Sequence, residues 1–320
     1  MAAAGLYSLF PIEEVTVIGL AAIPRRVATI LRRIRQTATA VIAARPDVLV
    51  IIDSPDFTHR VARRVRKAAP DIPIVDYVSP SVWAWRPGRA RAMRAYVDHV
   101  LALLPFEPAA HERLGGPPCS YVGHPLSEQV AELRPNTEEL RRRDADPPLV
   151  LLLPGSRSGE IARHLEVFGA AMARLADRCG PLELVLPTVP HLAERVRQQT
   201  ASWRVPPRIV VAPADKWAAF RVARAALAAS GTVTLELAVA GVPTVVAYKV
   251  SLLTELIYRA AVRVPTIVLA NLVLGRNVMP EITQREATPE RLAAALAPLL
   301  GDTAERQQQM DAFARLDAVM

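Results

Sequence analysis

Apolar runs alternate along the chain with segments whose apolar residues recur at helical spacing. Short, continuous runs of Val, Ile, Leu and Ala are typical of strands buried on both faces of a parallel sheet. Helical segments between such runs are typical of βα units. The pattern therefore predicts an α/β protein with parallel sheets. The expected strands lie at residues 48–52, 72–77, 97–104, 119–122, 149–153, 182–186, 208–211, 225–228 and 244–248.

A polar segment with two prolines, residues 144–148, interrupts this alternation near the middle of the chain. One βα series precedes it and a second begins after it, as expected at a domain boundary. We therefore expect a first domain over residues 1–145 and a second over residues 146–320, which ends in a trailing helix. In open α/β sheets ligands bind beyond the carboxyl ends of the strands, so the site residues are expected there.

The composition restricts the classes of function. Apolar residues make up 51% of the chain, which suits two folded domains. The longest apolar stretch, residues 252–274, contains three charged residues that argue against a membrane span. Two cysteines are too few for a disulfide framework and suit a reducing cytoplasm. The net charge of +8 favours anionic partners such as phosphosugars, nucleotides or acidic lipids, whereas no motif predicts nucleic-acid binding.

Residues 24–44 have the pattern of an amphipathic helix with several arginines on its polar side. Such a helix can lie on an anionic membrane surface. More often a helix of this kind covers a sheet, and we expect that to be its main role.

Residues 76–86 place two tryptophans, a proline and an arginine where a strand is expected to end. Trp83 and Trp85 are half of the 4 tryptophans in the chain. A loop so rich in stiff, bulky residues either forms a rigid buried corner or shapes a binding surface. Composition alone leaves both interpretations open.

Two strand ends are followed by turns of small residues that lead into helices. In the first turn, Gly155 and Gly159 allow a tight bend, and the helix N-terminus presents N–H groups to a phosphate. Arg157 can add a bidentate contact. The alternative is a plain strand-to-helix turn with a surface arginine.

In the second turn, Ser230 or Thr232 can cap the helix that follows. Glu236 lies about one turn inside that helix and can accept hydrogen bonds from a ribose diol. Its alternative role is that of a helix-dipole partner. Two phosphate-type turns in one half of the chain favour a nucleotide diphosphate over a single phosphate.

Carboxylates and a histidine supply candidate chemistry in the first half. Asp53 and Asp56 follow a buried strand, where a carboxylate can take the proton from an attacking hydroxyl. Asp53 can equally cap a loop by accepting hydrogen bonds from backbone N–H groups. Two carboxylates alone do not make a metal site. His124 is isolated in the sequence, and a lone histidine is more often structural.

Seven segments that include these features occur in the order typical of one enzyme family, at residues 51–57, 76–86, 104–107, 122–126, 153–157, 230–236 and 270–276. The chain in this respect resembles the lipid-A-disaccharide synthase family. One match would be weak, whereas a collinear series over most of the chain is specific. The resemblance implies an inverting glycosyltransferase with the GT-B fold, in which two Rossmann-like parallel-sheet domains face a cleft.

The resemblance also implies roles for individual residues. Asp53 would be the catalytic base or orient the acceptor, and His124 would be a second catalytic candidate beside the cleft. Asn271 can instead form an Asx turn, and Glu281 and Gln284 can instead begin a helix. The residues implied to bind substrates are Gly155, Ser156, Arg157, Ser230, Gly231, Thr232, Glu236, Asn271, Arg276, Glu281, Gln284, Trp83, Trp85 and Arg86.

The implied reaction transfers 2,3-diacylglucosamine from UDP-2,3-diacylglucosamine to 2,3-diacylglucosamine 1-phosphate (lipid X) and releases UDP, a step of lipid A biosynthesis. The acceptor 6-hydroxyl would attack the anomeric carbon with inversion. No metal or other cofactor is implied. The implied location is the cytoplasmic face of the inner membrane of a Gram-negative cell, through peripheral contact, and a homo-oligomer is compatible with this assignment.

The ends of the chain differ from the family pattern. Family members begin with a strand and a Gly-Glu-x-Ser-Gly-Asp loop, whereas residues 5–7 resemble the middle of the first domain. We therefore expect an incomplete first domain without its first strand and glycine loop, and a second domain that stops before the family's last helix. Two alternatives are a truncated, inactive remnant that binds UDP, and another GT-B enzyme that acts on UDP-sugars.

Overall fold

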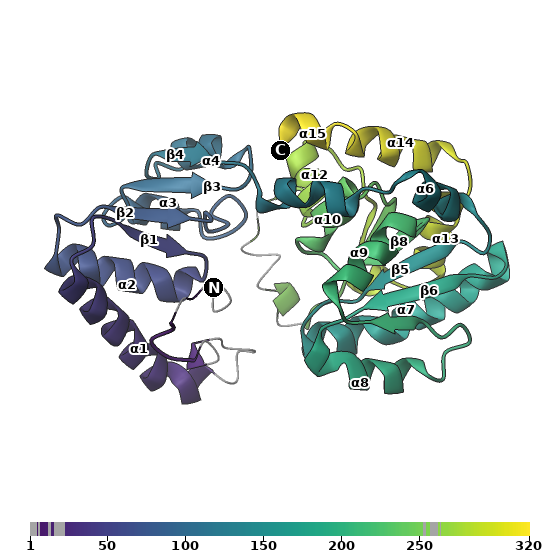
Figure 1. The fold of residues 1–320 in the computed structure, drawn as a ribbon, viewed down its shortest axis with the longest axis horizontal. Helices are drawn as coiled ribbons and strands as arrows, with labels where there is room; N and C mark the ends of the chain where they lie inside the picture. The colour runs from purple at the N-terminus through teal and green to yellow at the C-terminus, as the bar shows by residue number, and fades with distance from the viewer. Residues whose placement is uncertain are drawn as a thin grey trace. The chain divides into compact units, whose positions relative to one another are not determined.

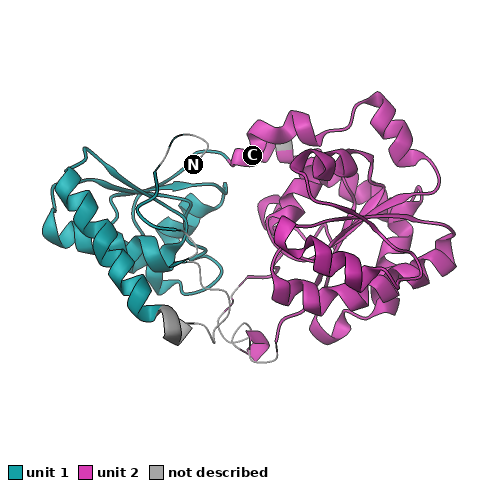
Figure 2. Ribbon diagram, turned by 60° about the horizontal axis from the view of Figure 1, so that its bottom comes forward, with its two compact units in different colours: residues 1–123 teal, residues 124–320 magenta. Residues whose placement is uncertain are grey.

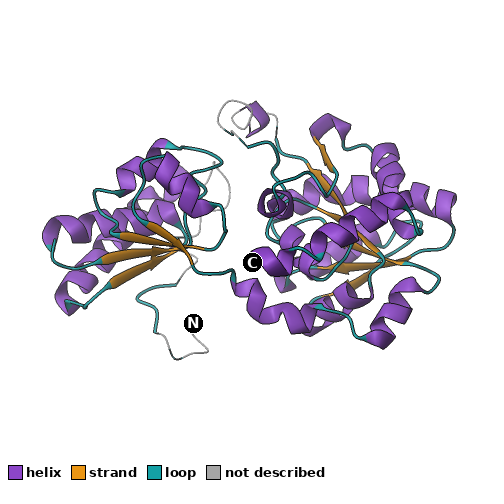
Figure 3. Ribbon diagram, turned by 90° about the horizontal axis from the view of Figure 1, so that it is seen from above, coloured by secondary structure: helices purple, strands orange, loops and turns teal. Residues whose placement is uncertain are grey.

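The computed structural model describes residues 5, 7–11, 14–15, 23–251, 254–256, 262 and 264–320 (Figure 1). By their internal contacts they form two compact units, Met1–Gly123 and His124–Met320 (Figure 2). Each unit has one parallel sheet, and Figure 3 shows helices lying along both sheets. The predicted α/β class with parallel sheets is therefore confirmed.

The first unit has a four-stranded sheet in the order β1-β2-β3-β4, and all neighbouring strands run parallel. The carboxyl ends of β1 and β2 are adjacent, because Ile52 pairs with Tyr77. The elements of this unit are α1 (Ile23–Ala44), β1 (Leu49–Ile52), α2 (Pro55–Ala68), β2 (Ile74–Tyr77), α3 (Gly88–Met93), β3 (His99–Ala102), α4 (Glu107–Arg113) and β4 (Cys119–Tyr121).

Helix α1 covers the first unit through its apolar side. It packs against α2, and its Ile34 and Ala38 join a buried cluster with Val65 of α2 and Ile74 of β2. Arg32 of α1 stays exposed. The apolar side of the amphipathic segment is thus buried in the first unit, chiefly against α2 and not directly on the sheet.

The second unit has a six-stranded parallel sheet in the order β10-β9-β8-β5-β6-β7. Its strands are β5 (Leu149–Leu153), β6 (Glu183–Pro187), β7 (Arg208–Val210), β8 (Ala225–Ala228), β9 (Thr244–Tyr248) and β10 (Glu281–Thr283). Its α-helices are α5 (Val130–Leu133), α6 (Thr137–Asp144), α7 (Ser158–Cys179), α8 (Pro190–Thr200), α9 (Pro213–Val222), α10 (Val233–Val239), α12 (Leu269–Leu274), α13 (Pro289–Leu300), α14 (Ala304–Phe313) and α15 (Leu316–Val319). In the described part of this unit, 3₁₀ turns span Pro125–Gln129 and Gln284–Glu286.

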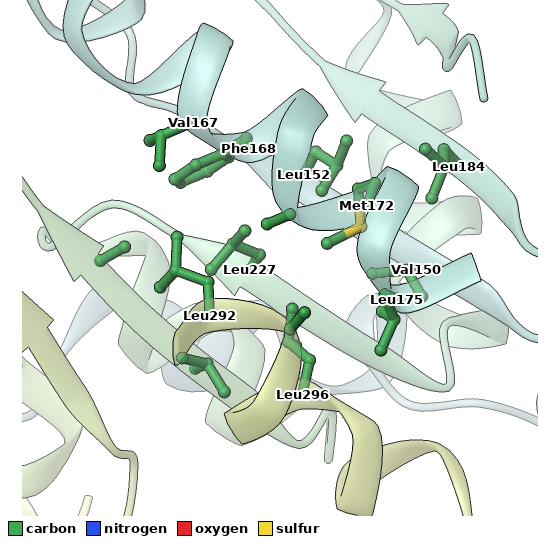
Figure 4. Close-up of a cluster of buried hydrophobic side chains, with 14 of the residues drawn as sticks. Val150, Leu152, Val167, Phe168, Met172, Leu175, Leu184, Leu227, Leu292 and Leu296 are labelled. Carbon is green, nitrogen blue, oxygen red and sulfur yellow. The ribbon is translucent and has the colours of Figure 1, made fainter. Parts of the chain in front are cut away.

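The core of the second unit lies between the sheet and helices α7 and α13. Phe168 and Met172 of α7 are fully buried against Leu152 of β5 and Leu292 of α13 (Figure 4). All five residues of β5 are buried, as the apolar run predicted for a central parallel strand. This core holds the carboxyl ends of β5 and β8 next to each other, because Leu153 pairs with Ala228.

The boundary between the units lies before α5 and α6, not at residues 145–146 as predicted. Arg143 of α6 is buried and donates hydrogen bonds to the carbonyl oxygens of Phe220 and Ala240, at 3.1 and 3.0 Å. Its guanidinium thereby caps the last turns of α9 and α10 and holds α6 on the second unit. The proline-bearing segment 144–148 is only the turn between α6 and β5.

Among the described helices, none is long and apolar enough to cross a bilayer. Part of the apolar stretch 252–274 lies outside the described residues.

Candidate active site

The first phosphate-type turn is occupied by a carboxylate of the chain itself. Glu160 Oε2 accepts hydrogen bonds from the backbone N–H groups of Ser156 and Arg157, at 3.1 and 3.3 Å. Gly155 has φ 114°, and a Cβ there would lie 2.5 Å from Glu160 Oε2. An anion that uses these amides must therefore displace Glu160. Arg157 Nη1 lies 2.7 Å from Glu160 Oε1, and the arginine side chain remains 69% exposed.

The second turn is held by hydrogen bonds that differ from the predicted cap. Thr232 precedes α10 and forms no side-chain cap. Ser230 Oγ instead donates to Ile267 O at 2.7 Å, and Thr234 Oγ1 donates to Gly231 O at 2.9 Å. The prediction that Ser230 or Thr232 caps this helix was wrong, because the hydroxyl of Ser230 ties the turn to the segment before α12.

Glu236 pairs with a lysine that the sequence did not single out. Lys216 Nζ of α9 lies 2.6 Å from Glu236 Oε2 and 4.3 Å from the centre of the Trp217 ring. Burial lowers the pKa of His124, while the charge of Glu236 raises it. His124 Nδ1 accepts a hydrogen bond from Leu126 N at 3.1 Å. The second unit thus places His124, Lys216 and Glu236 in one electrostatic environment.

Asn271 shapes the loop that follows α12. Its amide group donates to Asn277 Oδ1 and Met279 O, at 2.8 and 2.9 Å. Its Oδ1 accepts hydrogen bonds from Val278 N and Met279 N, both at 2.9 Å. Asn271 is buried, whereas Arg276 on the loop is exposed. The side chain of Arg276 is therefore accessible from solvent, whereas the amide of Asn271 is used within the loop.

Glu281 and Gln284 also make internal contacts. Glu281 lies in β10 and accepts a hydrogen bond from Thr266 Oγ1 at 2.7 Å. Gln284 begins a 3₁₀ turn, and its Oε1 accepts from Val250 N at 2.9 Å. Both side chains order loops beside the second turn, and direct contact with a donor stays a prediction.

In the first unit, Asp53 stands on a strained turn at the end of β1. Asp53 and Ser54 have φ values of 48° and 49°, a left-handed pair that costs about 1–3 kcal/mol per residue and is typical of functional sites. Thr58 Oγ1 donates to Asp53 O at 2.7 Å and supports the turn. The side chain of Asp53 is exposed, and the next residue, Ser54, precedes α2 without a side-chain cap. Asp56, in contrast, accepts from Arg89 at 3.0 Å.

The loop after β2 combines both interpretations of residues 76–86. Trp83 packs edge-to-face on Phe106, with ring centres 5.1 Å apart, and forms the inner part of the loop. Trp85 is 37% exposed, and the guanidinium of Arg86 lies 4.3 Å above its ring. The inner part is a buried corner, and the outer part presents an aromatic and cationic surface.

Comparison with known proteins identifies the family. Residues 1–318 match the family described as lipid-A-disaccharide synthetase. The lipid-A-disaccharide synthase of Bradyrhizobium diazoefficiens is 60% identical over 320 residues, which cover 100% of this chain and 82% of that protein. That of Nitrobacter hamburgensis is 61% identical, with 100% and 81% covered. The chain belongs to the lipid-A-disaccharide synthetase family. It is a glycosyltransferase, and the predicted resemblance is confirmed.

Solved structures show the same fold at low sequence identity. A UDP-GlcNAc 2-epimerase from Neisseria meningitidis has a TM-score of 0.60 and 11% identity, and covers 92% of this chain and 81% of its own. MurG of Acinetobacter baumannii has a TM-score of 0.54 and 18% identity, with 93% and 77% covered. These likenesses confirm the GT-B fold. The family match favours the synthase over the alternative of another UDP-sugar enzyme.

Histidine 164 is a residue of the enzyme's second unit that sequence analysis missed. It is fully buried, and its ring nitrogens lie 2.8 Å from Pro154 O and 2.9 Å from Lys249 N. Because Nε2 accepts from the Lys249 amide, Nδ1 carries the proton and donates to Pro154. His164 therefore joins the loops that follow β5 and β9. A single histidine on an apolar helix face gave no signal of this role.

Acidification is expected to destabilise the second unit through His164. Burial lowers the pKa of His164 below 6.5, so the folded chain disfavours a proton that the unfolded chain binds. The contribution of His164 to the free energy of unfolding is fully present above about pH 6.5. It decreases as pH falls below this value, by at most about 1.4 kcal/mol per pH unit. Thermal unfolding at about pH 7.5 and about pH 5.5 measures the decline. His164→Gln should reduce it, and the exposed-site variant His191→Gln should not; equal declines in all three proteins would refute the assignment.

Proposed function

We propose that this enzyme joins UDP-2,3-diacylglucosamine to 2,3-diacylglucosamine 1-phosphate and releases UDP. The family match over residues 1–318 carries the proposal. The acceptor 6-oxygen bonds to the anomeric carbon as the bond from that carbon to the UDP oxygen breaks, with inversion. The electron pair of the broken bond leaves with UDP, and the proton of the 6-hydroxyl passes to a base. The product is the tetraacyl disaccharide 1-phosphate.

The second unit supplies groups suited to UDP. The two phosphate-type turns follow adjacent strands, and Arg157 offers an exposed guanidinium to the diphosphate. Positive charge held near the departing phosphate stabilises the transition state more than the ground state. Glu236 is the proposed acceptor of hydrogen bonds from the ribose; its Oε2 pairs with Lys216, which leaves Oε1 for this contact.

The first unit supplies the base. Asp53 lies on a strained turn and its side chain is exposed, so its carboxylate is accessible to the proton of an acceptor hydroxyl. Such proton transfer typically contributes about 10²–10⁴-fold to a rate. Asp56 is less suited to this role because Arg89 already engages it.

The function is tested by turnover with both acylated substrates in mixed micelles. The expected result is equal amounts of disaccharide 1-phosphate and UDP. Non-acylated UDP-N-acetylglucosamine should give neither disaccharide nor epimer. Epimerisation of that compound would favour another UDP-sugar enzyme, and UDP binding without any turnover would favour the inactive remnant.

We also propose that the enzyme works on the cytoplasmic face of the inner membrane by peripheral contact. Both substrates carry acyl chains, and exposed Arg60, Arg64 and Lys67 make one side of α2 basic. Basic residues near an anionic surface contribute about 1 kcal/mol each.

Vesicle sedimentation tests the membrane proposal. Binding is expected with vesicles that contain phosphatidylglycerol, not with phosphatidylcholine alone, and should weaken with added salt. The double variant Arg60→Ala/Arg64→Ala should bind about 30-fold more weakly, since each substitution loses about 1 kcal/mol. The control is Arg195→Ala, an exposed site on α8. Salt-independent binding, or equal binding of both variants, would refute the proposal.

A further inference from the structure

Two buried side chains on one face of α4 hold the loop after β2. Glu107 is 3% exposed, and its Oε1 accepts a hydrogen bond from Trp83 Nε1 at 3.0 Å. Its Oε2 accepts from Leu104 N, also at 3.0 Å. One carboxylate therefore connects the Trp83 indole to the turn that begins α4.

His111 makes the second attachment, one helical turn further along α4. It is fully buried, and its Nε2 lies 2.8 Å from Ser79 Oγ. Glu107 on the helix therefore contacts Trp83 on the loop, and His111 contacts Ser79. A Cβ at Gly116 would lie 2.5 Å from His111 Nδ1, so only glycine fits beside the ring. The loop is thus fastened at its start and at its middle.

The fastened part determines where the outer part of the loop points. Ser79 and Val82 are buried and Trp83 packs on Phe106, so these three residues anchor the inner part of the loop. Two residues later Trp85 emerges, and Arg86 has φ 52°, which turns its guanidinium over the Trp85 ring. An aromatic face with a cation above it suits a sugar that carries a phosphate.

We propose that Glu107 and His111 are positioning residues for the reaction, which hold the Trp85–Arg86 pair in place for the anionic, acylated acceptor. This inference rests on the proposed function, together with the substrate contact that the family resemblance implies for Trp85 and Arg86. Neither Glu107 nor His111 touches the reacting atoms; both act through residues 79–86. Losing the attachment should weaken acceptor binding and leave the chemical step nearly unchanged.

The surroundings of Glu107 make its hydrogen bonds to the loop dependent on pH. Burial raises the pKa of Glu107 to about 7, against its hydrogen bonds with Trp83 and Leu104, and the nearby charge of Asp76 raises it further. Burial, with the charges of Glu107 and Asp76, also raises the pKa of Cys119 to about 12, so that thiol stays neutral. Asp76 lies 3.3 Å from His59 Nε2. Burial lowers the pKa of His111, while Asp76 raises it.

A fall in pH is expected to raise the contribution of Glu107 to the free energy of unfolding but to weaken its hydrogen bonds to Trp83 and Leu104. Because its folded pKa is raised from 4.5 to about 7, Glu107 favours folding most at low pH and loses this contribution as pH rises through 7. The ionised carboxylate accepts both N–H groups, whereas the hydroxyl oxygen of the neutral acid is a weaker acceptor. Acid should therefore loosen the loop even where this group makes the fold more stable.

The first test follows the Trp83 indole N–H by NMR in the full chain labelled with ¹⁵N-tryptophan. The 4 tryptophans give separate indole signals, and Trp83→Phe assigns the relevant one. We expect that signal to titrate with a midpoint near 7, as the Glu107 pKa requires, and to be pH-independent in Glu107→Gln. An unchanged titration in Glu107→Gln, or none in the wild-type chain, would overturn the inference. This measurement needs no turnover, so it stands apart from the proposed function.

The second test compares KM for the acceptor among matched variants. Glu107→Gln and Ser79→Ala should each raise it about tenfold, the effect of one lost hydrogen bond to a charged or buried group, with kcat within about threefold. Glu112→Gln, exposed on the same helix, is the control. If Glu107→Gln does not fold, Ser79→Ala and the wild-type titration decide.

Variants of Trp85 and Arg86 distinguish failure of the proposed acceptor-binding role of the loop from failure of the proposed positioning role of Glu107 and His111. If Trp85→Ala and Arg86→Gln leave the acceptor KM unchanged, the loop does not bind the acceptor. The positioning role of Glu107 and His111 is then refuted as well. If they raise KM while Glu107→Gln and Ser79→Ala do not, the loop binds acceptor but the positioning role is wrong.

Discussion

Replacing Asp53 is expected to lower turnover by about 10²–10⁴-fold, the usual contribution of a general base, while UDP affinity stays unchanged. Asp53→Asn is the sharper variant, because asparagine tolerates the left-handed conformation that Asp53 adopts at φ 48°. It removes the basic carboxylate without adding backbone strain. Asp53→Ala should lose the same activity and also some stability, since alanine is disfavoured at positive φ.

Steady-state kinetics with both acylated substrates measures the loss in turnover, and calorimetric titration measures UDP binding. Asp56→Asn is the matched control, because Asp56 lies three residues away and is engaged by Arg89. It should retain most activity. A loss of UDP binding in Asp53→Asn, with turnover reduced only in proportion, would rule out the assigned role.

Arg157→Ala is expected to reduce kcat by about 10²–10³-fold, as removal of one charge-stabilising donor typically does. Its guanidinium is 69% exposed and lies next to the first phosphate-type turn. Without it, Glu160 would keep the amides of Ser156 and Arg157 and leave the turn with net negative charge. We therefore expect weaker UDP binding as well, with partial recovery in Arg157→Lys, which restores the charge but not a bidentate contact.

Rates at saturating donor and the affinity for UDP measure these effects separately. Arg178→Ala provides the control, because Arg178 is exposed at the far end of the same helix. Both quantities should be unchanged in that variant. An Arg157→Ala enzyme with normal kcat and normal UDP affinity would show that the diphosphate binds elsewhere.

Nine of the ten strands in the described part of the chain were predictable, because each of the nine is a continuous apolar run. All nine apolar runs form strands, and β5 is buried along its whole length as its sequence indicates. Strand β10, Glu281–Thr283, was missed because it is short and has polar residues at both ends. The unit boundary was misplaced because Arg143, which ties α6 to the second unit, contacts carbonyl groups far away in the sequence.

The sequence by itself determined the fold class, the family and the strand ends at which the candidate residues lie, since these follow from local periodicity and from motifs in order. Only the tertiary structure decided the polar pairs whose members lie far apart in the sequence. It placed Lys216 next to Glu236, and Glu107 next to the indole of Trp83. Such pairings depend on which strand ends parallel crossovers bring together, and on which carboxylates become buried there. Neither property is a function of nearby sequence.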